Sequence, residues 1–546
     1  MVKKMVVVLL AVGLLGATAR QDAKIDTKWV NPTTTTGVVK QAWNILYTDS
    51  SNNAYTFWAI SQDPIAVSGD TIVYVYRQYQ PDGSGFIAIT ATIDGGVTWM
   101  HDERVNEDAG LLIDGGRYPS AEIAVYPIAS WAELEGGWGH PMVAAGDYIT
   151  PDLALGVDPG NFSTHKSIAK RLPDGNVAVF GVTTGDEVLT YVFDPNTGTI
   201  VGTVDTAITA VYPTAIVPDY ANGKIWLLAW DDNVGYRGWA LDINNFPAVI
   251  DSIDFPLPPV VECGTYTDSL GTHPDTIDVF NWMWLDGAVL NDGTPVVVAD
   301  MFRNNSTYFG LQQGIVLMRP DTTFYVLGPD SLLNVYYPQL SYDAANNVLA
   351  LFWEQMVEPF TGADTVYGWG RYEVYMMYSL DGGYTWTAPE KVLGDSTINV
   401  SMLQVCRNMQ GERVYLAYML NAADPMYDIY MDVWTDATGA SVSMEYDYFG
   451  YLEPVGIRES HGGALKFTVK SNIGSRMDIE FALDNATSVK VGLYDVAGRL
   501  VKSETFAGKA GLNSISINTG DLPRGVYFVK VSAGDLKGVA KTVVVK

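Results

Sequence analysis

The chain has 546 residues and a formal net charge of −29, from 62 acidic and 33 basic side chains. Nucleic-acid-binding proteins need a basic surface against phosphate, so this charge argues against that class and equally against docking on anionic lipid. The sequence is 48% hydrophobic and 12% aromatic, which excludes a chain that is disordered as a whole. Its length predicts one large repetitive body and a smaller domain.

Residues 1–19 have the parts of a secretory signal peptide. Two lysines near the start are followed by an apolar stretch, 5–16, that is short for a membrane span, and Ala-Thr-Ala at 17–19 fits the cleavage rule. We expect the mature chain to start at Arg20, to be exported and to carry no transmembrane span. A membrane anchor is the alternative.

Residues 20–450 are predicted to be β-structure. Apolar or alternating runs such as TIVYVYRQY, KIWLLAWDD and NVLALFWEQ are separated by Gly, Asp, Asn and Pro. A Tyr-Pro phrase recurs in RYPSAEIA, VYPTAIVP and YYPQLSYD, with the tyrosines at 118, 212 and 337. Halving these gaps gives a unit of about 45–60 residues, the size of a four-stranded propeller blade. The prediction is an all-β propeller of six or seven blades, closed by a strand near 41–48.

Two phrases in this body, TIDGGVTW and SLDGGYTW, are nearly the same. They resemble the Asp-box, S/T-x-D-x-G-x-T/S-W/F, of sialidase-like (BNR-repeat) propellers. An Asp carboxylate can accept backbone N–H bonds across its own turn, glycine adopts positive φ at low cost, and a Trp ring can fill the gap between blades. The resemblance implies structural turns on the rim away from the central site. The matching positions are Thr92, Asp94, Gly96, Thr98 and Trp99, and Ser379, Asp381, Gly383, Thr385 and Trp386.

The same resemblance raises the question of catalysis. Sialidases hold the substrate carboxylate with several arginines. They use a Tyr–Glu pair as nucleophile and base and an Asp as the general acid. The Arg-Ile-Pro phrase that usually marks the first of these arginines is absent, and the alternative for every arginine is an ordinary ion pair. No catalytic residue is therefore assigned, and an exo-glycosidase stays the alternative. The candidates are Arg77, Arg303, Arg371 and Glu354, from a wider pool that includes Arg117, Arg237, Arg407 and Asp300.

No cofactor or metal site is predicted. The five histidines are scattered and no HExxH motif occurs. A calcium ion on an Asp-Gly loop such as 290–293 is a weaker alternative, because no EF-hand spacing supports it. Whether Cys263 and Cys406 form a disulfide is left open, since two thiols make no framework.

Aromatic residues offer a binding hypothesis. They could line an open funnel and contact sugar rings or the side chains of a partner, or they could pack between blades. The residues in question are Trp131, Trp138, Trp282, Trp284 and Trp353.

The composition changes after about residue 451. Residues 451–465 are predicted to be a linker, and 466–546 form about seven short alternating strands, typical of a small Ig-like β-sandwich. This segment resembles the C-terminal type A sorting domain of the type IX (Por) secretion system through LYDVAGRLV, LPRGVYFVKV and the ending KTVVVK. The family's opening Asn-Pro phrase is replaced here by Ser-Asn-Ile-Gly at 471–474. The motif positions are Tyr494, Asp495, Gly498, Arg499, Gly525 and Tyr527.

Together these features predict an exported protein at the outer-membrane surface or outside the cell. The resemblance implies that the type IX machinery delivers it by its tail. The body is expected to bind a glycan or a protein, with no role for nucleic acid. The alternatives are a sialidase-like glycoside hydrolase and a structural or adhesive surface component.

Overall fold

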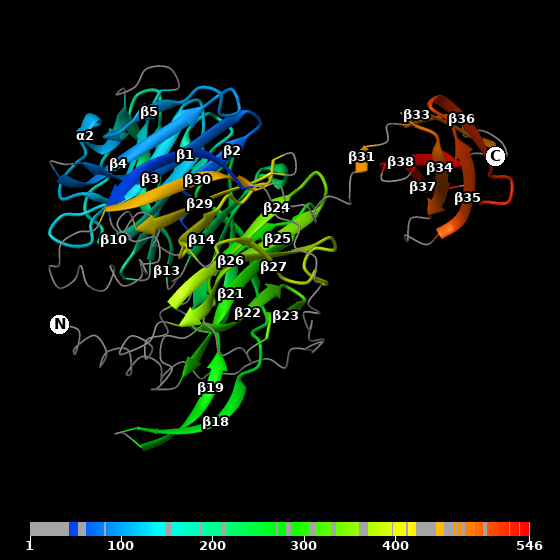
Figure 1. The fold of residues 1–546 in the computed structure, drawn as a ribbon. Coiled ribbons are helices and arrows are strands. Elements are labelled where there is room, and N and C mark those ends of the chain that lie inside the picture. Colours follow the sequence, from blue (N-terminus) through cyan, green and yellow to red (C-terminus); the bar gives the residue numbers. More distant parts are fainter. Residues whose placement is uncertain are drawn as a thin grey trace. The chain divides into compact units, whose positions relative to one another are not determined.

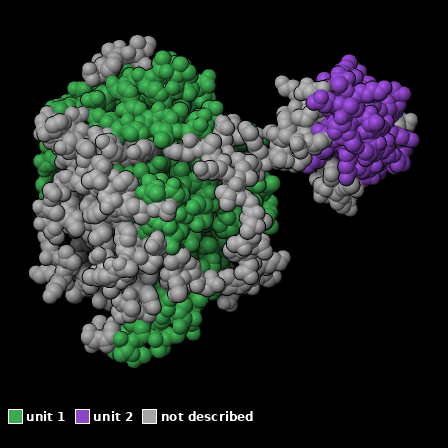
Figure 2. Space-filling view, viewed as in Figure 1, with its two compact units in different colours: residues 1–453 green, residues 454–546 purple. Residues whose placement is uncertain are grey.

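The computed structural model shows two compact units, Met1–Glu453 and Pro454–Lys546 (Figure 2). The predicted signal peptide at 1–19 lies outside the described residues. Strands make up nearly all of the regular structure in both units (Figure 1). In the part of the chain that the structure describes, no helix is long and apolar enough to cross a membrane. The described residues are 43–52, 62–80, 83–147, 154–185, 187–209, 214–268, 271–279, 285–304, 312–328, 335–359, 370–395, 397–410, 413–421, 444–452, 462–464, 467–471, 476–483, 485–494, 500–523, 525–533 and 536–544.

Unit 1 is built from antiparallel sheets in which strands adjacent in sequence pair with one another. Four of these sheets have four strands each. The first two consist of β6 (Gly116–Ile123), β7 (Pro127–Glu133), β8 (His140–Ala145) and β9 (Leu155–Val157), and of β10 (Thr164–Arg171), β11 (Val177–Thr183), β12 (Glu187–Asp194) and β13 (Thr199–Thr209). The other two consist of β14 (Thr214–Asp219), β15 (Lys224–Asp231), β16 (Gly235–Asp242) and β17 (Val249–Asp254), and of β24 (Val335–Asp343), β25 (Val348–Pro359), β26 (Gly370–Ser379) and β27 (Glu390–Leu393).

Two larger sheets complete unit 1. The six-stranded sheet adds the hairpin β18 (Val261–Asp268) and β19 (Gly271–Asp278) to β20 (Leu285–Val289), β21 (Pro295–Asn304), β22 (Gln312–Arg319) and β23 (Thr322–Leu327). The eight-stranded sheet joins β2 (Ile65–Ser68), β3 (Thr71–Gln80), β4 (Gly83–Thr92) and β5 (Met100–Asp102) to β28 (Ser401–Val405), β29 (Val414–Asn421), β30 (Met444–Leu452) and β1 (Trp43–Asn52). Short helical turns α2 (Val105–Asp108) and η2 (Tyr220–Asn222) interrupt the strands.

The pairing pattern is that of a propeller. The eight-stranded sheet is two four-stranded groups linked by a single pair, Ser51 with Gln78, so the described strands form seven four-stranded groups plus one hairpin. Neighbouring groups meet through their first or second strands: β6 packs on β10 and on both β2 and β3, and β20 packs on β14 and β24. The prediction of an all-β propeller is confirmed, and the grouping favours the seven-bladed alternative.

The first strand of the chain closes the last group. β1 pairs with β30 from Trp43 opposite Leu452 to Asn52 opposite Met444. This pairing confirms the predicted closing strand near 41–48. A strand from one end of the body thus completes a sheet whose other three strands come from the opposite end, so no edge is left open at that point.

Apolar side chains fill the spaces between groups. One core joins Tyr74 and Tyr76 of β3 with Phe449 of β30, and another joins Trp226 of β15 with Met301 of β21. Strands with both faces covered read as continuous apolar runs, which explains why these segments are so rich in Val, Ile, Leu and aromatic residues.

The Tyr-Pro phrase marks a bulge in the first strand of a group. The register of β6 shifts between Arg117 and Ser120, and Tyr118 has φ of 53°. The same shift occurs in β24, where Tyr337 also has φ of 53°. The Tyr-Pro pair at 212 and 213 lies outside the described residues. A non-glycine residue in the left-handed conformation costs conformational free energy. Both tyrosine rings are buried at the bulge, and their burial offsets part of that cost.

Unit 2 is a sandwich of two sheets. One sheet holds β31 (Gly462–Ala464), β34 (Thr487–Tyr494), β35 (Leu500–Gly508), β37 (Gly525–Ala533) and β38 (Leu536–Val544), and the other holds β32 (Phe467–Ser471), β33 (Arg476–Leu483) and β36 (Gly511–Asn518). Its core takes alternate residues from both sheets, such as Ile479 of β33 and Val491 of β34.

Candidate functional site

The candidate arginines of unit 1 are held by neighbouring carboxylates. Arg303 on β21 donates from Nε and Nη2 to Asp275 on β19, at 3.1 and 2.8 Å. Arg371 on β26 donates from Nη1 to Oε1 of Glu373 at 2.6 Å and to the backbone oxygen of Asp395 at 2.8 Å. The first pair anchors the β18–β19 hairpin to its sheet, and the second holds the segment after β27. These contacts are structural in kind.

The remaining candidates lie inside the sheets. Glu354 on β25 is fully buried, and its Oε1 accepts the backbone N–H of Leu403 at 2.5 Å. Arg77 on β3 and Asp300 on β21 are also buried. Arg237 on β16 contacts Asp231 and Asp254 within its own sheet. The structure therefore places Arg77, Arg303 and Arg371 on strands of three different groups.

A buried ion network joins the first strands of several groups. Arg407, directly after β28, donates from Nε to Asp63 at 2.7 Å and from Nη1 to Asp286 on β20. Lys170 on β10 donates to the second oxygen of Asp63 at 2.6 Å. These four residues, which we call the axial network, are each no more than 9% exposed. They connect four different groups, so the network ties the ring together across its centre.

Burial and charge act in opposite directions on the two carboxylates of the axial network. At Asp286 burial is the larger effect and raises the pKa, in spite of the nearby charge of Arg407. Burial alone would raise the pKa of Asp63, but the nearby positive charges of Arg407 and Lys170 outweigh it and lower that pKa. Lys166 lies on β10 near the same groups, and burial lowers its pKa to about 7. A buried ion pair stabilises only when its polar atoms are satisfied. Here Leu340 N–H also donates to Asp286 and Gly287 O accepts from Arg407.

Sequence reasoning missed Asp63, Lys170 and Asp286 and counted Arg407 only among a pool of arginines. The available signal was a charged residue inside an otherwise apolar first strand, as in THKSIAKR at 164–171. Charged residues are almost never fully buried without a partner, so such positions indicate a buried network.

The two Asp-box phrases form the same hydrogen-bonded turn. In the first, Asp94 Oδ1 accepts the N–H groups of Val97 and Thr98 at 3.0 and 2.9 Å, and Oδ2 accepts the Thr98 hydroxyl at 2.6 Å. Hydrogen bonds to Thr98 contribute most to lowering the pKa of Asp94 to about 2. The ring N–H of Trp99 donates to Gly96 O at 3.1 Å.

The second copy repeats these contacts. Asp381 accepts the N–H and hydroxyl of Thr385 at 2.9 and 2.6 Å, and the Trp386 ring donates to Gly383 O at 3.0 Å. The glycines have φ of 94° at Gly96 and 97° at Gly383. A Cβ at Gly383 would lie 2.3 Å from the side chain of Leu317 in the neighbouring group. Positive φ and this close approach together explain why glycine stands there.

The tryptophan of each turn packs between two groups. Trp99 lies against Tyr47 of β1 and Phe449 of β30, with ring centroids 6.2 and 6.3 Å apart. Trp386 joins the core that contains residues of β22 and β25. These contacts are those expected of a plug between sheets.

The candidate tryptophans differ in how far they are buried. Trp131 on β7 and Trp353 on β25 are fully buried, and Trp131 donates its ring N–H to Glu133 at 2.8 Å. Both pack between groups and cannot line an open funnel. Trp138, in the loop between β7 and β8, is 40% exposed. Trp282 and Trp284 lie outside the described residues.

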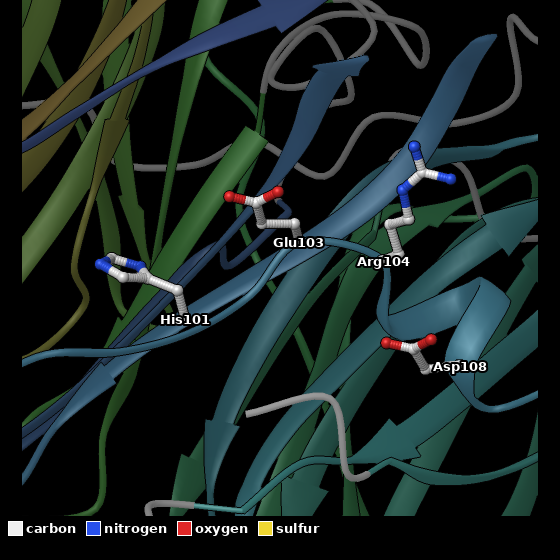
Figure 3. A pocket seen from close by; sticks show the side chains of 4 residues that line it. All are labelled: His101, Glu103, Arg104 and Asp108. Atoms are coloured by element: carbon white, nitrogen blue, oxygen red, sulfur yellow. The ribbon is translucent and has the colours of Figure 1, made fainter. Parts of the chain in front are cut away.

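A surface hollow of about 400 Å³ lies beside β5, and Figure 3 shows the four side chains that line it: His101, Glu103, Arg104 and Asp108. Arg104 pairs with Glu107 at 2.8 Å and lies over the ring of Phe86. Burial lowers the pKa of His101, whose ring stacks on Tyr47. The hollow thus offers a neutral imidazole and charges of both signs, which suits a small polar ligand at most.

Next to this hollow, Asp49 on β1 links the group that contains β1 to the group that contains β3. Its Oδ2 accepts hydrogen bonds from Tyr47, Tyr76 and Gln78 at 3.0, 2.5 and 2.8 Å. Three donors on one carboxylate oxygen make this a fixed joint between β1 and β3, where the ladder has only one residue pair.

Within the described ranges, no group of three or more His, Cys, Asp or Glu side chains is arranged to hold a metal ion. Cys263 is exposed on β18 and Cys406 is buried, and both thiols are free.

In unit 2, the described motif residues have structural places. Tyr527 on β37 is buried and donates its hydroxyl to Pro523 O at 2.9 Å. β34 and β35 form a hairpin in which Tyr494 pairs with Leu500. Gly525 begins β37. Asp495, Gly498 and Arg499 lie outside the described residues.

Comparison with solved structures gives only distant likenesses. They include a GH43B protein of the Bacteroides ovatus xyloglucan PUL (11% identity, 91% of this chain and 92% of that chain, TM-score 0.30). Another is a PL25 ulvan lyase (9% identity, 92% of this chain and 96% of that chain, TM-score 0.35). A third is the phage phi92 endosialidase (10% identity, 91% of this chain and 87% of that chain, TM-score 0.36). Such low identities and TM-scores do not extend the activities of those proteins to this chain. No curated protein matches the chain.

The C-terminal unit is different. Residues 474–546 match the family described as the secretion system C-terminal sorting domain. That match confirms the resemblance of the tail and the predicted export. The chain therefore ends in a type IX sorting domain and is exported to the outer-membrane surface or the extracellular space.

Proposed function

We propose that the body, residues 20–450, is a sialidase-like (BNR, Asp-box) propeller that binds a glycan or protein partner without hydrolysing it. The sorting domain delivers this body to the cell exterior.

The observation that carries the proposal is the commitment of Arg303 and Arg371 to carboxylates next to them. A sialidase arginine must present its guanidinium fork to the carboxylate of the substrate. A fork already bound to Asp275 or Glu373 would have to break a charge-assisted pair first. Glu354 is likewise buried and bound to backbone, away from the solvent that a nucleophile or base needs.

The Asp-box turns support the same conclusion. The side chains of Thr92, Asp94 and Trp99, and those of Ser379, Asp381 and Trp386, form hydrogen bonds within their own turns. Such a turn stabilises the outer strands and leaves function to the loops on the other edge of the sheets.

The test uses the full secreted chain on arrays of glycans, and of extracellular glycoproteins with their deglycosylated forms as matched controls. The proposal predicts saturable binding to at least one ligand, with the ligand recovered unchanged. Arg303→Lys keeps the charge but loses the bidentate geometry, so it should lower stability and leave binding intact. Absence of binding on every array, from a chain with an intact unfolding transition, would contradict the proposal.

A further inference from the structure

Two loops of unit 1 form a surface beside β10. They are the β7–β8 loop at 134–139 and the β9–β10 loop at 158–163. Because strand direction alternates in these sheets, both loops lie at the same edge, opposite the edge that carries the Asp-box turns. Gly139 and Thr164 exchange two backbone hydrogen bonds, of 3.2 and 2.7 Å, which tie the first loop to β10.

Trp138 is the exposed tryptophan of the first of these loops. Its ring centroid lies 6.2 Å from those of Tyr118 and of His165, both of which are buried. Burial lowers the pKa of His165 to about 3, so its ring is neutral and adds no charge behind the indole. One side of the tryptophan is therefore supported by fixed rings while 40% of the residue is exposed. Phe162 in the second loop is 36% exposed.

Polar side chains of the same two loops are held in place by hydrogen bonds. His140 contacts Asp158 through Nδ1 at 2.7 Å and Glu135 through Nε2 at 3.2 Å. Asn161 donates to the same oxygen of Glu135 at 3.0 Å. The side chain of Glu135 is 57% exposed and that of Asp158 is 36% exposed, whereas that of His140 is 7% exposed. Hydrogen bonds from Asn161 and His140 lower the pKa of Glu135.

We propose that this surface, the Trp138 platform (Trp138, Phe162, Glu135, Asp158 and Asn161), binds a sugar ring of a neutral glycan. The apolar C–H face of a pyranose stacks on the Trp138 indole, and its hydroxyl groups donate to the exposed carboxylate oxygens of Glu135 and Asp158. The inference rests on the proposed binding function of the body and names the ligand class and the surface.

Charge and rigidity both favour a neutral sugar. The two loops carry two exposed carboxylates, and the whole chain carries a net charge of −29, so a sialylated or sulfated glycan would be repelled. A ring and carboxylates that are already held in position lose little freedom when the ligand binds. A single large amphipathic side chain supported from behind is the usual anchor of a binding surface.

The test titrates the full secreted chain with cello-, xylo-, manno- and laminari-oligosaccharides, and with sialyllactose as the anionic probe. We expect at least one neutral oligosaccharide to bind and sialyllactose not to bind. Trp138→Ala should weaken that binding about tenfold or more, as expected for the loss of an aromatic anchor. Trp138→Phe keeps an aromatic face and should recover most of the affinity.

Tyr384→Ala is the matched control, because Tyr384 is 43% exposed but lies on the Asp-box edge. Its affinity should equal that of the unaltered chain, and near-ultraviolet circular dichroism checks that the Trp138 variants stay folded. Equal binding by Trp138→Ala would overturn the platform while leaving the proposed function intact. Binding of sialyllactose alone, or of proteins but no oligosaccharide, would also overturn it.

Discussion

In the axial network and beside the Trp138 platform, a basic side chain lies between two carboxylates, in opposite surroundings. Arg407 lies between Asp63 and Asp286, with all three side chains at most 10% exposed. His140 lies between Asp158 and Glu135, whose side chains are 36% and 57% exposed. Arginine stays charged, and the pairs of Arg407 are buried. The carboxylates that contact His140 are exposed to solvent. We infer that burial separates the cluster that holds the ring from the one that can contact a ligand.

Removing Arg407 from the axial network should have the largest effect. Arg407→Met leaves Asp286 buried without its cation and Asp63 with Lys170 alone, and breaking a buried pair in this way costs about 3–5 kcal/mol. No tryptophan follows Trp434 in the sequence, so denaturation followed by tryptophan fluorescence reports on unit 1 alone. Arg476→Met, at an exposed pair with Asp478 in unit 2, is the control. An unchanged unit 1 midpoint for Arg407→Met would show that the network does not hold the ring.

The buried Lys166 should make the stability of unit 1 depend on pH. Its pKa is lowered to about 7 in the folded chain and is about 10.4 when unfolded. Between these values the unfolded state binds more protons, so the stability of the native chain rises with pH. We expect native unit 1 to gain stability relative to Lys166→Met as pH is raised from about 7 to about 10. Parallel stability profiles for the two proteins over this window would contradict the prediction.

His140 should show the opposite sign and a smaller effect. Burial lowers its pKa, but hydrogen bonds and charges from Asp158 and Glu135 outweigh burial and raise it. Its contribution is complete below the unfolded pKa of about 6.5 and is lost as pH rises through the folded pKa. The stability advantage of the native chain over His140→Gln should therefore be largest near pH 5.5 and disappear at alkaline pH. A constant difference would mean that protonation of His140 does not hold the two loops.

The smallest effect is expected where the pair is most exposed. Arg104 and Glu107 are joined at 2.8 Å, but their side chains are 28% and 46% exposed. Arg104→Met should change the stability of unit 1 by no more than about 0.5–1 kcal/mol, the usual range for exposed pairs. A loss as large as that of Arg407→Met would remove burial as the explanation for the difference between clusters.

Much of the fold could be predicted from the sequence because its signals are local. Each Asp-box turn forms within eight residues, and the Tyr-Pro phrase marks a bulge within one strand. The phrases that identify the sorting tail lie in its β34–β35 and β37–β38 hairpins. These features depend on neighbours in the chain, so residue type and spacing carry the information.

The candidate site was harder to predict because its contacts are distant in sequence. Asp63 and Arg407 are 344 positions apart, and nothing in either neighbourhood indicates the other. Trp131 and Trp138 are only seven positions apart, yet one is buried in a strand and the other is exposed in a loop. Residue type alone cannot separate them, although the glycines around Trp138 indicate a loop.

A hydrolysis assay distinguishes a body that only binds its ligand from one that also cleaves it. The purified full chain is incubated with a panel of chromogenic glycosides that includes a sialoside, beside Glu354→Gln and Arg371→Lys. The account predicts no product from any of the three proteins, with the native chain shown to be folded by its fluorescence transition. Turnover by the native chain that disappears in Glu354→Gln or Arg371→Lys would contradict it and make the body a glycoside hydrolase.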